Sequence, residues 1–227
     1  MPLDKEQLRS NLDRVIWNIE QARIKVSEHH IVRIVAVGKY TEVANLRTLY
    51  ALGQRAFGEN QVQQLSQRIE VLDDLPLEWH MIGSLQKNKI NKLIDLRPAL
   101  MHSLDSLELA EALQQRLEAR NSTLECLLQI NSAQEETKSG VTPESAVDTY
   151  HKILEKYPAI VLRGVMTIGA HTDDKALIRK SFETTHAIYE HLQPHGADTC
   201  SMGMSSDYEL AIECGSNMVR VGSALFT

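Results

Sequence analysis

The order of hydrophobic and polar residues predicts one long helix followed by a regular alternation of strands and helices. Residues 4–28 carry apolar side chains at the spacing of one helix face: Leu8, Leu12, Val15, Ile16, Ile19, Ala22 and Val26. Runs rich in β-branched residues then predict strands near residues 31–37, 55–57, 78–82, 99–102, 123–130, 160–166, 197–201 and 217–221. Helical patterns fill the gaps at residues 42–52, 60–74, 86–95, 106–119, 143–156, 174–192 and 206–214.

Strands that alternate with helices are typical of a parallel α/β fold, either a closed (β/α)8 TIM barrel or an open doubly wound sheet. The number of strands and their even spacing favour the barrel, as does the lack of a GxGxxG motif after the first strand. The length of 227 residues is close to the minimum for a barrel. We therefore expect one domain over residues 1–227, a TIM barrel with an extra N-terminal helix.

Composition adds limits on partners and location. The chain is 43% hydrophobic and 24% charged, with a net charge of −6 and scattered basic residues, so we expect a globular protein that binds neither nucleic acid nor membrane. The cysteines, Cys126, Cys200 and Cys214, lie far apart and lack a metal-binding spacing, which indicates reduced thiols and a cytoplasmic protein. Without an exposed heptad pattern, a monomer is expected.

Lys39 is the first candidate for chemistry, because it directly follows the strand-like run IVRIVAV and Gly38. In parallel α/β folds, ligands bind where strands end and helices begin. An amine held on an apolar wall there is a candidate carbonyl-trapping group, since desolvation lowers the pKa of a lysine. The alternative is a solvated loop residue.

Polar and small residues also collect after the other predicted strands, as expected of a binding mouth. Asn60 follows the second strand, Ile82 and Gly83 the third, Ser205 the seventh, and Gly222 and Ser223 the eighth. Glycine and serine after strands seven and eight can cradle a phosphate, and equally can serve as a helix cap and a turn.

Two further residues stand within the predicted strands. Arg220 interrupts the apolar run MVRVG, so it is either a ligand contact or a partner of a buried acid such as Glu59 or Asp207. His80, in EWHMIG, is expected to be a core histidine with one hydrogen-bonded nitrogen rather than a catalytic group.

Taken together, the motifs resemble one family, the pyridoxal-phosphate homeostasis proteins, also called the YggS or PROSC family. The similarity runs in order from about residue 30 to the end of the chain. The motifs that carry it are VAVGK, FGEN, EWHMIGSLQKNK, QINSAQEETKSG, GVMTIGA, SMGMSSDYELAIECGS and VRVGSALF.

The resemblance implies a barrel of the alanine-racemase N-terminal type with pyridoxal 5′-phosphate at its mouth. Lys39 would form the Schiff base and Arg220 would face the pyridine nitrogen. Further cofactor-binding residues would be Asn60, Ile82, Gly83, Met202, Ser205, Gly222 and Ser223. The chain departs from the family at Gly38, where serine or threonine is frequent, and at Ser84, where proline is frequent.

The resemblance also implies a carrier that stores, buffers or delivers the cofactor, with apo forms of cofactor-dependent enzymes as partners. An arginine opposite the pyridine nitrogen keeps that nitrogen unprotonated and weakens the ring as an electron sink. Related racemases use a second base, a tyrosine from an additional domain, and Tyr40 is expected to point away from Lys39. The alternative is a weak amino-acid racemase. A metal-dependent enzyme ranks last.

Overall fold

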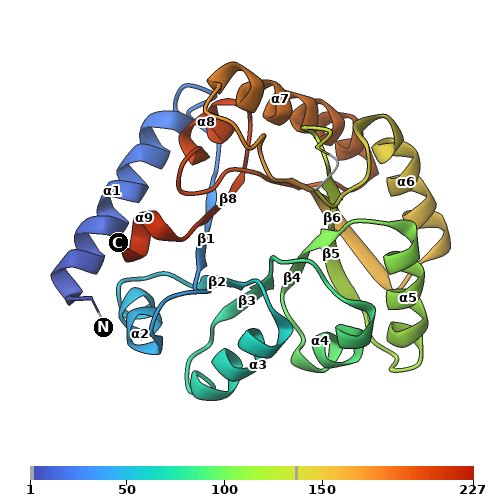
Figure 1. Cartoon of the computed structure of the whole chain (residues 1–227), viewed down its shortest axis with the longest axis horizontal. Coiled ribbons are helices and arrows are strands. Elements are labelled where there is room, and N and C mark those ends of the chain that lie inside the picture. The colour runs from blue at the N-terminus through green and yellow to red at the C-terminus, as the bar shows by residue number, and fades with distance from the viewer. Residues whose placement is uncertain (1–2, 136–137) are drawn as a thin grey trace.

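Eight parallel strands close into a barrel in the computed structural model, which describes residues 3–135 and 138–227 (Figure 1). Each strand pairs with the next along the chain, and β8 pairs with β1. The strands are β1 (Arg33–Val37), β2 (Ala56–Glu59), β3 (Glu78–Met81), β4 (Leu100–Leu104), β5 (Leu124–Ile130), β6 (Ile160–Thr167), β7 (Thr199–Ser201) and β8 (Met218–Val221). The predicted TIM barrel is confirmed, and the open sheet is excluded.

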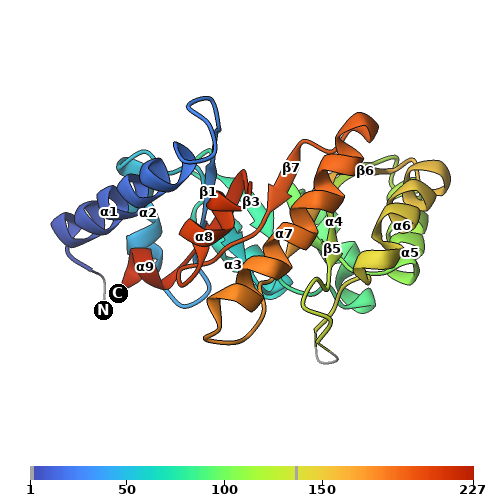
Figure 2. The same ribbon diagram turned by 90° about the horizontal axis from the view of Figure 1, so that it is seen from above.

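Helices surround the barrel, as the two perpendicular views show (Figures 1 and 2). They are α1 (Lys5–Arg23), α2 (Val43–Ala51), α3 (Val62–Val71), α4 (Ile90–Leu96), α5 (Leu107–Glu118), α6 (Pro143–Lys156), α7 (Lys175–Leu192), α8 (Tyr208–Glu213) and α9 (Ser223–Phe226). Two single 3-10 turns, Lys87–Lys89 and Gln193–His195, adjoin α4 and α7.

The hydrophobic core has two parts because successive strand residues face opposite sides. A small cluster fills the inside of the barrel: Val35, Leu100, Leu127, Met166 and Met218. A much larger cluster lies between the barrel and its helices and includes Phe57, Leu128 and Val219. On each strand, the residue two positions after the inner-cluster residue therefore also faces the barrel interior. It lies closer to the C-terminal end of the strand.

The extra N-terminal helix completes the helical ring. The helix after β8, α9, is a single turn, too short to cover the junction between β8 and β1. Helix α1 contacts α8, α9 and α2 and buries Leu8, Leu12 and Val15. The Asn11 amide also donates to the carbonyls of Leu225 and Thr227, each at 3.0 Å. Helix α1 is thus a packing element in the position of an eighth outer helix.

Several helix boundaries differ from the sequence prediction, and two of these differences change the placement of predicted residues. Helix α1 ends at Arg23 rather than residue 28, and Ile16 and Val26, assigned to its apolar face, are each 42% exposed. Val15 takes the core position, and its neighbour Ile16 is turned about 100° away from it. Helix α8 begins at Tyr208, because Ser205 to Asp207 form a turn in which the Asp207 side chain accepts the Met204 N–H.

Within the described ranges, no helix is long and apolar enough to cross a membrane. The same residues contain no group of three or more side chains arranged to hold a metal ion. The three cysteines are free and buried, and burial raises the pKa of the Cys214 thiol to about 11.

Candidate functional site

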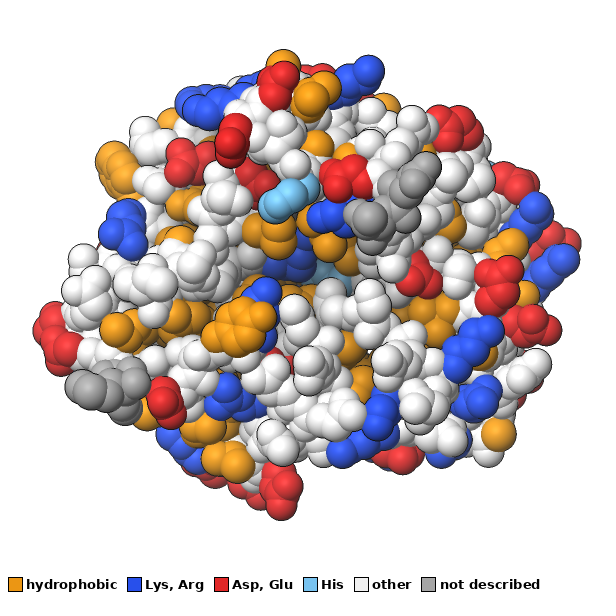
Figure 3. Space-filling model, in the orientation of Figure 1, with side chains coloured by type: hydrophobic (Ala, Val, Ile, Leu, Met, Phe, Trp, Pro, Cys, Tyr) orange, Lys and Arg blue, Asp and Glu red, His pale blue; other side chains and the backbone are white. Residues whose placement is uncertain are grey.

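The C-terminal ends of the strands meet at one face of the barrel, which has a central hollow with lysine or arginine and histidine atoms at its bottom (Figure 3). Strand pairing explains which residues meet there. Val35 lies beside Arg220 and Ala36 beside Val221, so the chain segments that follow β1 and β8 leave the barrel together. A Cβ built on Gly222 would be 3.4 Å from Val37 Cβ. The register therefore brings Lys39 to the same edge as Arg220, Gly222 and Ser223.

Lys39 lies in the turn between β1 and α2, and side chains from α3 hold that turn. Gln64 Nε2 donates to the Lys39 carbonyl at 2.6 Å. Arg68 Nη2 donates to the carbonyls of Thr41 at 2.5 Å and Gly38 at 3.3 Å. The backbone on both sides of Lys39 is therefore fixed, and its half-buried side chain extends from a rigid base.

The expectation that Tyr40 points away from Lys39 is wrong. The Lys39 amine lies 5.0 Å from the centroid of the Tyr40 ring, which is 91% exposed. Strand alternation does not apply here, because both residues follow β1 in a turn. The contact is a cation–π interaction at the surface of the mouth.

Glu59 lies behind the Lys39 turn, at the end of β2. Its side chain is fully buried, and neither carboxylate oxygen has a hydrogen-bond partner within the described part of the chain. Arg68 Nε, 3.4 Å from Oε1, is its ion-pair partner. Desolvation outweighs this pairing and raises the pKa of Glu59 to about 7.

Arg220 is buried inside the barrel and faces its C-terminal end. Nη1 donates to Ser201 Oγ at 2.7 Å and Nη2 to the Thr167 carbonyl at 2.9 Å. No carboxylate of residues 3–135 or 138–227 lies within ion-pair distance of the guanidinium, and Asp207 acts on it only at longer range. Burial lowers the pKa of Arg220 to about 10, so it stays protonated at neutral pH. The structural pair with Glu59 or Asp207 is thus absent.

His80 is a buried histidine, as predicted, but both of its ring nitrogens are hydrogen-bonded. Nε2 is 2.8 Å from Glu78 Oε1, and Nδ1 is 2.8 Å from Nε2 of His102. His102 Nδ1 in turn lies 3.1 Å from Ser201 Oγ. His102 and Ser201 were not singled out from the sequence, although each occupies an inward-facing position on its strand, as Arg220 does.

The segments after β7 and β8 meet at Ser205. Its hydroxyl oxygen accepts the N–H groups of Gly222 at 3.0 Å and Ala224 at 3.2 Å. Amides at the start of α9 therefore already point toward an oxygen atom. Two of the residues predicted to contact a phosphate, Ser205 and Gly222, are in direct contact, and Ser223 is exposed between Gly222 and Ala224.

The remaining predicted site residues divide into two groups. Asn60 and Gly83 belong to touching turns, because a Cβ on Gly83 would be 2.1 Å from the Asn60 carbonyl oxygen. Ile82 and Gly83 are half-buried beside them. Met202, in contrast, is fully buried in the outer core, so the structure does not bring it to the mouth.

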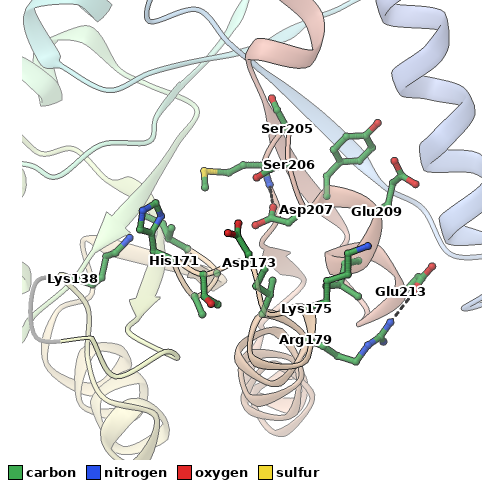
Figure 4. A pocket seen from close by; sticks show the side chains of 18 residues that line it. Lys138, His171, Asp173, Lys175, Arg179, Ser205, Ser206, Asp207, Glu209 and Glu213 are labelled. Carbon is green, nitrogen blue, oxygen red and sulfur yellow. Dashed lines mark hydrogen bonds and ion pairs between the residues drawn. The ribbon is translucent and has the colours of Figure 1, made fainter.

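A groove of about 850 Å³ opens from the Ser205 side of the mouth (Figure 4). Ser205, Ser206 and Asp207 line one side of it, and Lys138 and His171 lie opposite. Neither Lys39 nor Arg220 lines this groove. The groove therefore borders only the Ser205 end of the predicted site.

Comparison with known proteins places this geometry in context. Residues 10–227 match the family model for the alanine racemase N-terminal domain. The pyridoxal phosphate homeostasis protein of Helicobacter pylori strain J99 is 53% identical over 218 residues, which cover 96% of this chain and 97% of that protein. The corresponding protein of Pasteurella multocida is 38% identical, with 96% of each chain covered.

Solved structures share the fold. PipY of Synechococcus elongatus, determined with pyridoxal phosphate bound, is 31% identical with a TM-score of 0.78, and the match covers 92% of this chain and 99% of PipY. The alanine racemase of Clostridium difficile has a TM-score of 0.77 at 20% identity. That match covers 97% of this chain and 56% of the racemase, and it shows the fold alone.

Proposed function

The chain belongs to the family of pyridoxal phosphate homeostasis proteins, and from that premise we propose that it binds pyridoxal 5′-phosphate at the barrel mouth and stores, buffers or delivers it without robust catalysis. The observation that carries the proposal is Arg220, a buried guanidinium without a carboxylate partner in the described chain, at the edge that also holds Lys39. A buried cation of this kind needs an electron-rich partner. The relative solved with pyridoxal phosphate supports the identity of that partner.

The residues at the mouth fit each part of this cofactor. The amides of Gly222 and Ala224 converge on the Ser205 hydroxyl oxygen, and a phosphate oxygen can take the same bonds. Within the described part of the chain, Arg220 uses two of its five N–H groups, on Ser201 and Thr167, so others remain for the ring nitrogen. The turns of Asn60 and Gly83 supply one wall.

Lys39 is the amine we assign to covalent attachment. Its nitrogen would bond to the aldehyde carbon of the cofactor in a Schiff base, with the aldehyde oxygen leaving as water. Gln64 and Arg68 hold the backbone of Lys39 in place for this bond. The amine must lose a proton before it attacks, and because Lys39 is only half-buried, water can accept that proton.

The charge of Arg220 supports a carrier rather than an enzyme. Because Arg220 stays protonated, it disfavours a second positive charge on the ring nitrogen that it faces. The bound cofactor supplies an electron sink for amino-acid chemistry, and that sink is weaker when the nitrogen is unprotonated. The curated relatives are likewise named homeostasis proteins.

The second candidate function is a weak amino-acid racemase, which the fold shared with alanine racemase favours. Racemisation needs a second acid–base group across the ring from Lys39. Tyr40 packs against the Lys39 amine and follows it directly in the same turn, so it is placed on the same side as that amine. We therefore rank this candidate below the carrier.

The proposal extends to the cellular context. We propose that the 227 residues act as one cofactor-binding domain, a monomer in the cytoplasm, and that the cofactor passes from it to apo enzymes. The buried thiols, all free, support a reducing compartment.

The test is the visible absorption spectrum of purified protein with added pyridoxal phosphate, before and after borohydride. The proposal expects a visible band and, after reduction, peptide mass spectrometry that locates the cofactor on Lys39. Lys39→Ala should lose the band, whereas Lys175→Ala, a lysine of the groove, should keep it. Chiral analysis after incubation with single L-amino acids then separates carrier from racemase, because turnover that depends on Lys39 would overturn the carrier.

A further inference from the structure

A continuous line of hydrogen bonds crosses the inside of the barrel to Arg220. It starts at the floor of the barrel, the end where the strands begin. It runs from Arg220 Nη1 to Ser201 Oγ at 2.7 Å and from Ser201 Oγ to His102 Nδ1 at 3.1 Å. It continues from His102 Nε2 to His80 Nδ1 at 2.8 Å and from His80 Nε2 to Glu78 Oε1 at 2.8 Å. We call Glu78, His80, His102 and Ser201 the floor relay.

The directions of the two terminal bonds follow from the chemistry of Arg220 and Glu78. A guanidinium can only donate and an ionised carboxylate can only accept. The hydrogen bond from His80 lowers the pKa of Glu78, so this carboxylate is ionised. Burial holds the pKa of His102 well below its usual value, so this imidazole is neutral and must donate from one nitrogen and accept on the other.

When His80 carries a single ring proton, only one arrangement satisfies all four bonds. His80 donates from Nε2 to Glu78 and accepts on Nδ1, so His102 carries its proton on Nε2. His102 Nδ1 then accepts the Ser201 hydroxyl proton, and the Ser201 oxygen is left to accept from Arg220. Each donor thus points away from Arg220 toward Glu78.

The floor end of the relay is in contact with solvent. The Glu78 side chain is 47% exposed, whereas His80 and His102 are buried. A cavity of about 190 Å³ between the first residues of β1, β2 and β3 is lined by Arg33, Arg55, Glu78 and His80. Arg33, Arg55 and Glu78 are the charged side chains that line this cavity with His80, and His102 is the titratable partner of His80 on its other ring nitrogen.

We propose that the floor relay positions Arg220. Glu78 fixes the tautomers of His80 and His102. His102 then accepts the Ser201 hydroxyl proton, which leaves a lone pair of the Ser201 oxygen to hold Nη1 of Arg220. The four residues are positioning residues and do not touch the cofactor. This role rests on the proposed function, because Arg220 is assigned there to the ring nitrogen.

The first experiment needs no cofactor. Imidazole nitrogen NMR of histidine-labelled protein at neutral pH should show both His80 and His102 as the Nε2–H tautomer. Glu78→Ala should give mixed tautomers of both rings, and Glu78→Gln, whose amide oxygen can still accept, should restore the wild-type pattern. Glu125→Ala is the matched control, since Glu125 is a half-exposed, ion-paired carboxylate near the start of β5.

The second experiment measures the dissociation constant for pyridoxal phosphate. Removal of one hydrogen bond from the relay should weaken binding about two- to fivefold in Glu78→Ala and about five- to tenfold in Ser201→Ala, where Arg220 loses its partner directly. Glu125→Ala should bind as wild type does. An Nδ1–H tautomer of His102 in wild type, or unchanged His102 signals in Glu78→Ala, would overturn the relay. Failure of the wild type to bind the cofactor would overturn the proposed function and leave the tautomer result to decide the relay.

Discussion

Arg68 Nε lies 3.4 Å from Oε1 of Glu59, and this ion pair joins helix α3 to the end of β2 behind the Lys39 turn. The same guanidinium donates to the carbonyls of Gly38 and Thr41, the two residues that flank Lys39 and Tyr40. Arg68 is therefore both the partner of a buried carboxyl group and the clamp of the turn that carries the reactive amine.

Arg68→Met should loosen the Lys39 turn and destabilise the protein. We expect the free energy of unfolding to fall by about 2–3 kcal/mol, since the variant loses two backbone hydrogen bonds and leaves Glu59 without its counter-charge. Formation of the borohydride-trapped adduct on Lys39 should also slow. Urea unfolding and the trapping rate measure the two effects.

The matched control for this prediction is Arg47→Met, which removes the exposed ion pair with Asp74. We expect a change below about 1 kcal/mol for this surface pair. An equal loss of unfolding free energy in the two variants would contradict the role of Arg68 in holding the Lys39 turn.

Glu59 should make stability depend on pH between its unfolded and folded pKa values. Its ordinary pKa of 4.5 is raised to about 7 by desolvation, so between these values the folded protein holds a proton that the unfolded chain releases. Stability should therefore decrease as the pH rises from about 4.5 to 7 and then level off, by about 3 kcal/mol in all.

Glu59→Gln isolates this effect, because it keeps the shape of the side chain and removes its titration. The difference in unfolding free energy between Glu59→Gln and wild type should increase in favour of the variant from pH 5 to pH 7. Urea titrations at several pH values measure it, and a difference that does not change with pH would show that Glu59 keeps an ordinary pKa.

Gly38 explains in part why Glu59 has no hydrogen-bond donor among the described residues. A Cβ at position 38 would be 2.7 Å from Glu59 Oε1, so a side chain there points at the carboxyl group. Gly38→Ser should place a hydroxyl donor beside it after a small shift of the carboxylate, lower its pKa and so reduce the loss of stability between about pH 4.5 and 7. Gly38→Ala adds only the methyl group and should not, so equal pH profiles for the two variants would exclude the new hydrogen bond.

Most of the fold could be predicted from the sequence, because strand and helix periodicities are local properties. The predicted helix over residues 143–156 coincides with α6, and every predicted strand overlaps an observed one. The place of Lys39 directly after a strand also predicted its position at the strand ends, whereas the sequence left open whether Arg220 contacts a ligand or pairs with a buried acid. Partners across the barrel could not be predicted in this way, since nothing local indicates that His102 on β4 meets Ser201 on β7, or that Arg68 holds the carbonyls beside Lys39. Tyr40 was misplaced because strand alternation was extended into a turn.

Ser205→Ala tests the phosphate-binding site assigned to Ser205 and the amides of Gly222 and Ala224. The substitution removes the oxygen that accepts from Gly222 and Ala224, and we expect it to lower stability by about 1 kcal/mol. If the cofactor phosphate takes over these amides while it also bonds to the Ser205 hydroxyl, the dissociation constant for pyridoxal phosphate should rise about tenfold. Pyridoxal without its phosphate should bind the variant and the wild type equally. Ser206→Ala, one residue further in the same turn and exposed, is the control and should leave both ligands unaffected. An equal loss for pyridoxal and pyridoxal phosphate in Ser205→Ala would place the phosphate elsewhere.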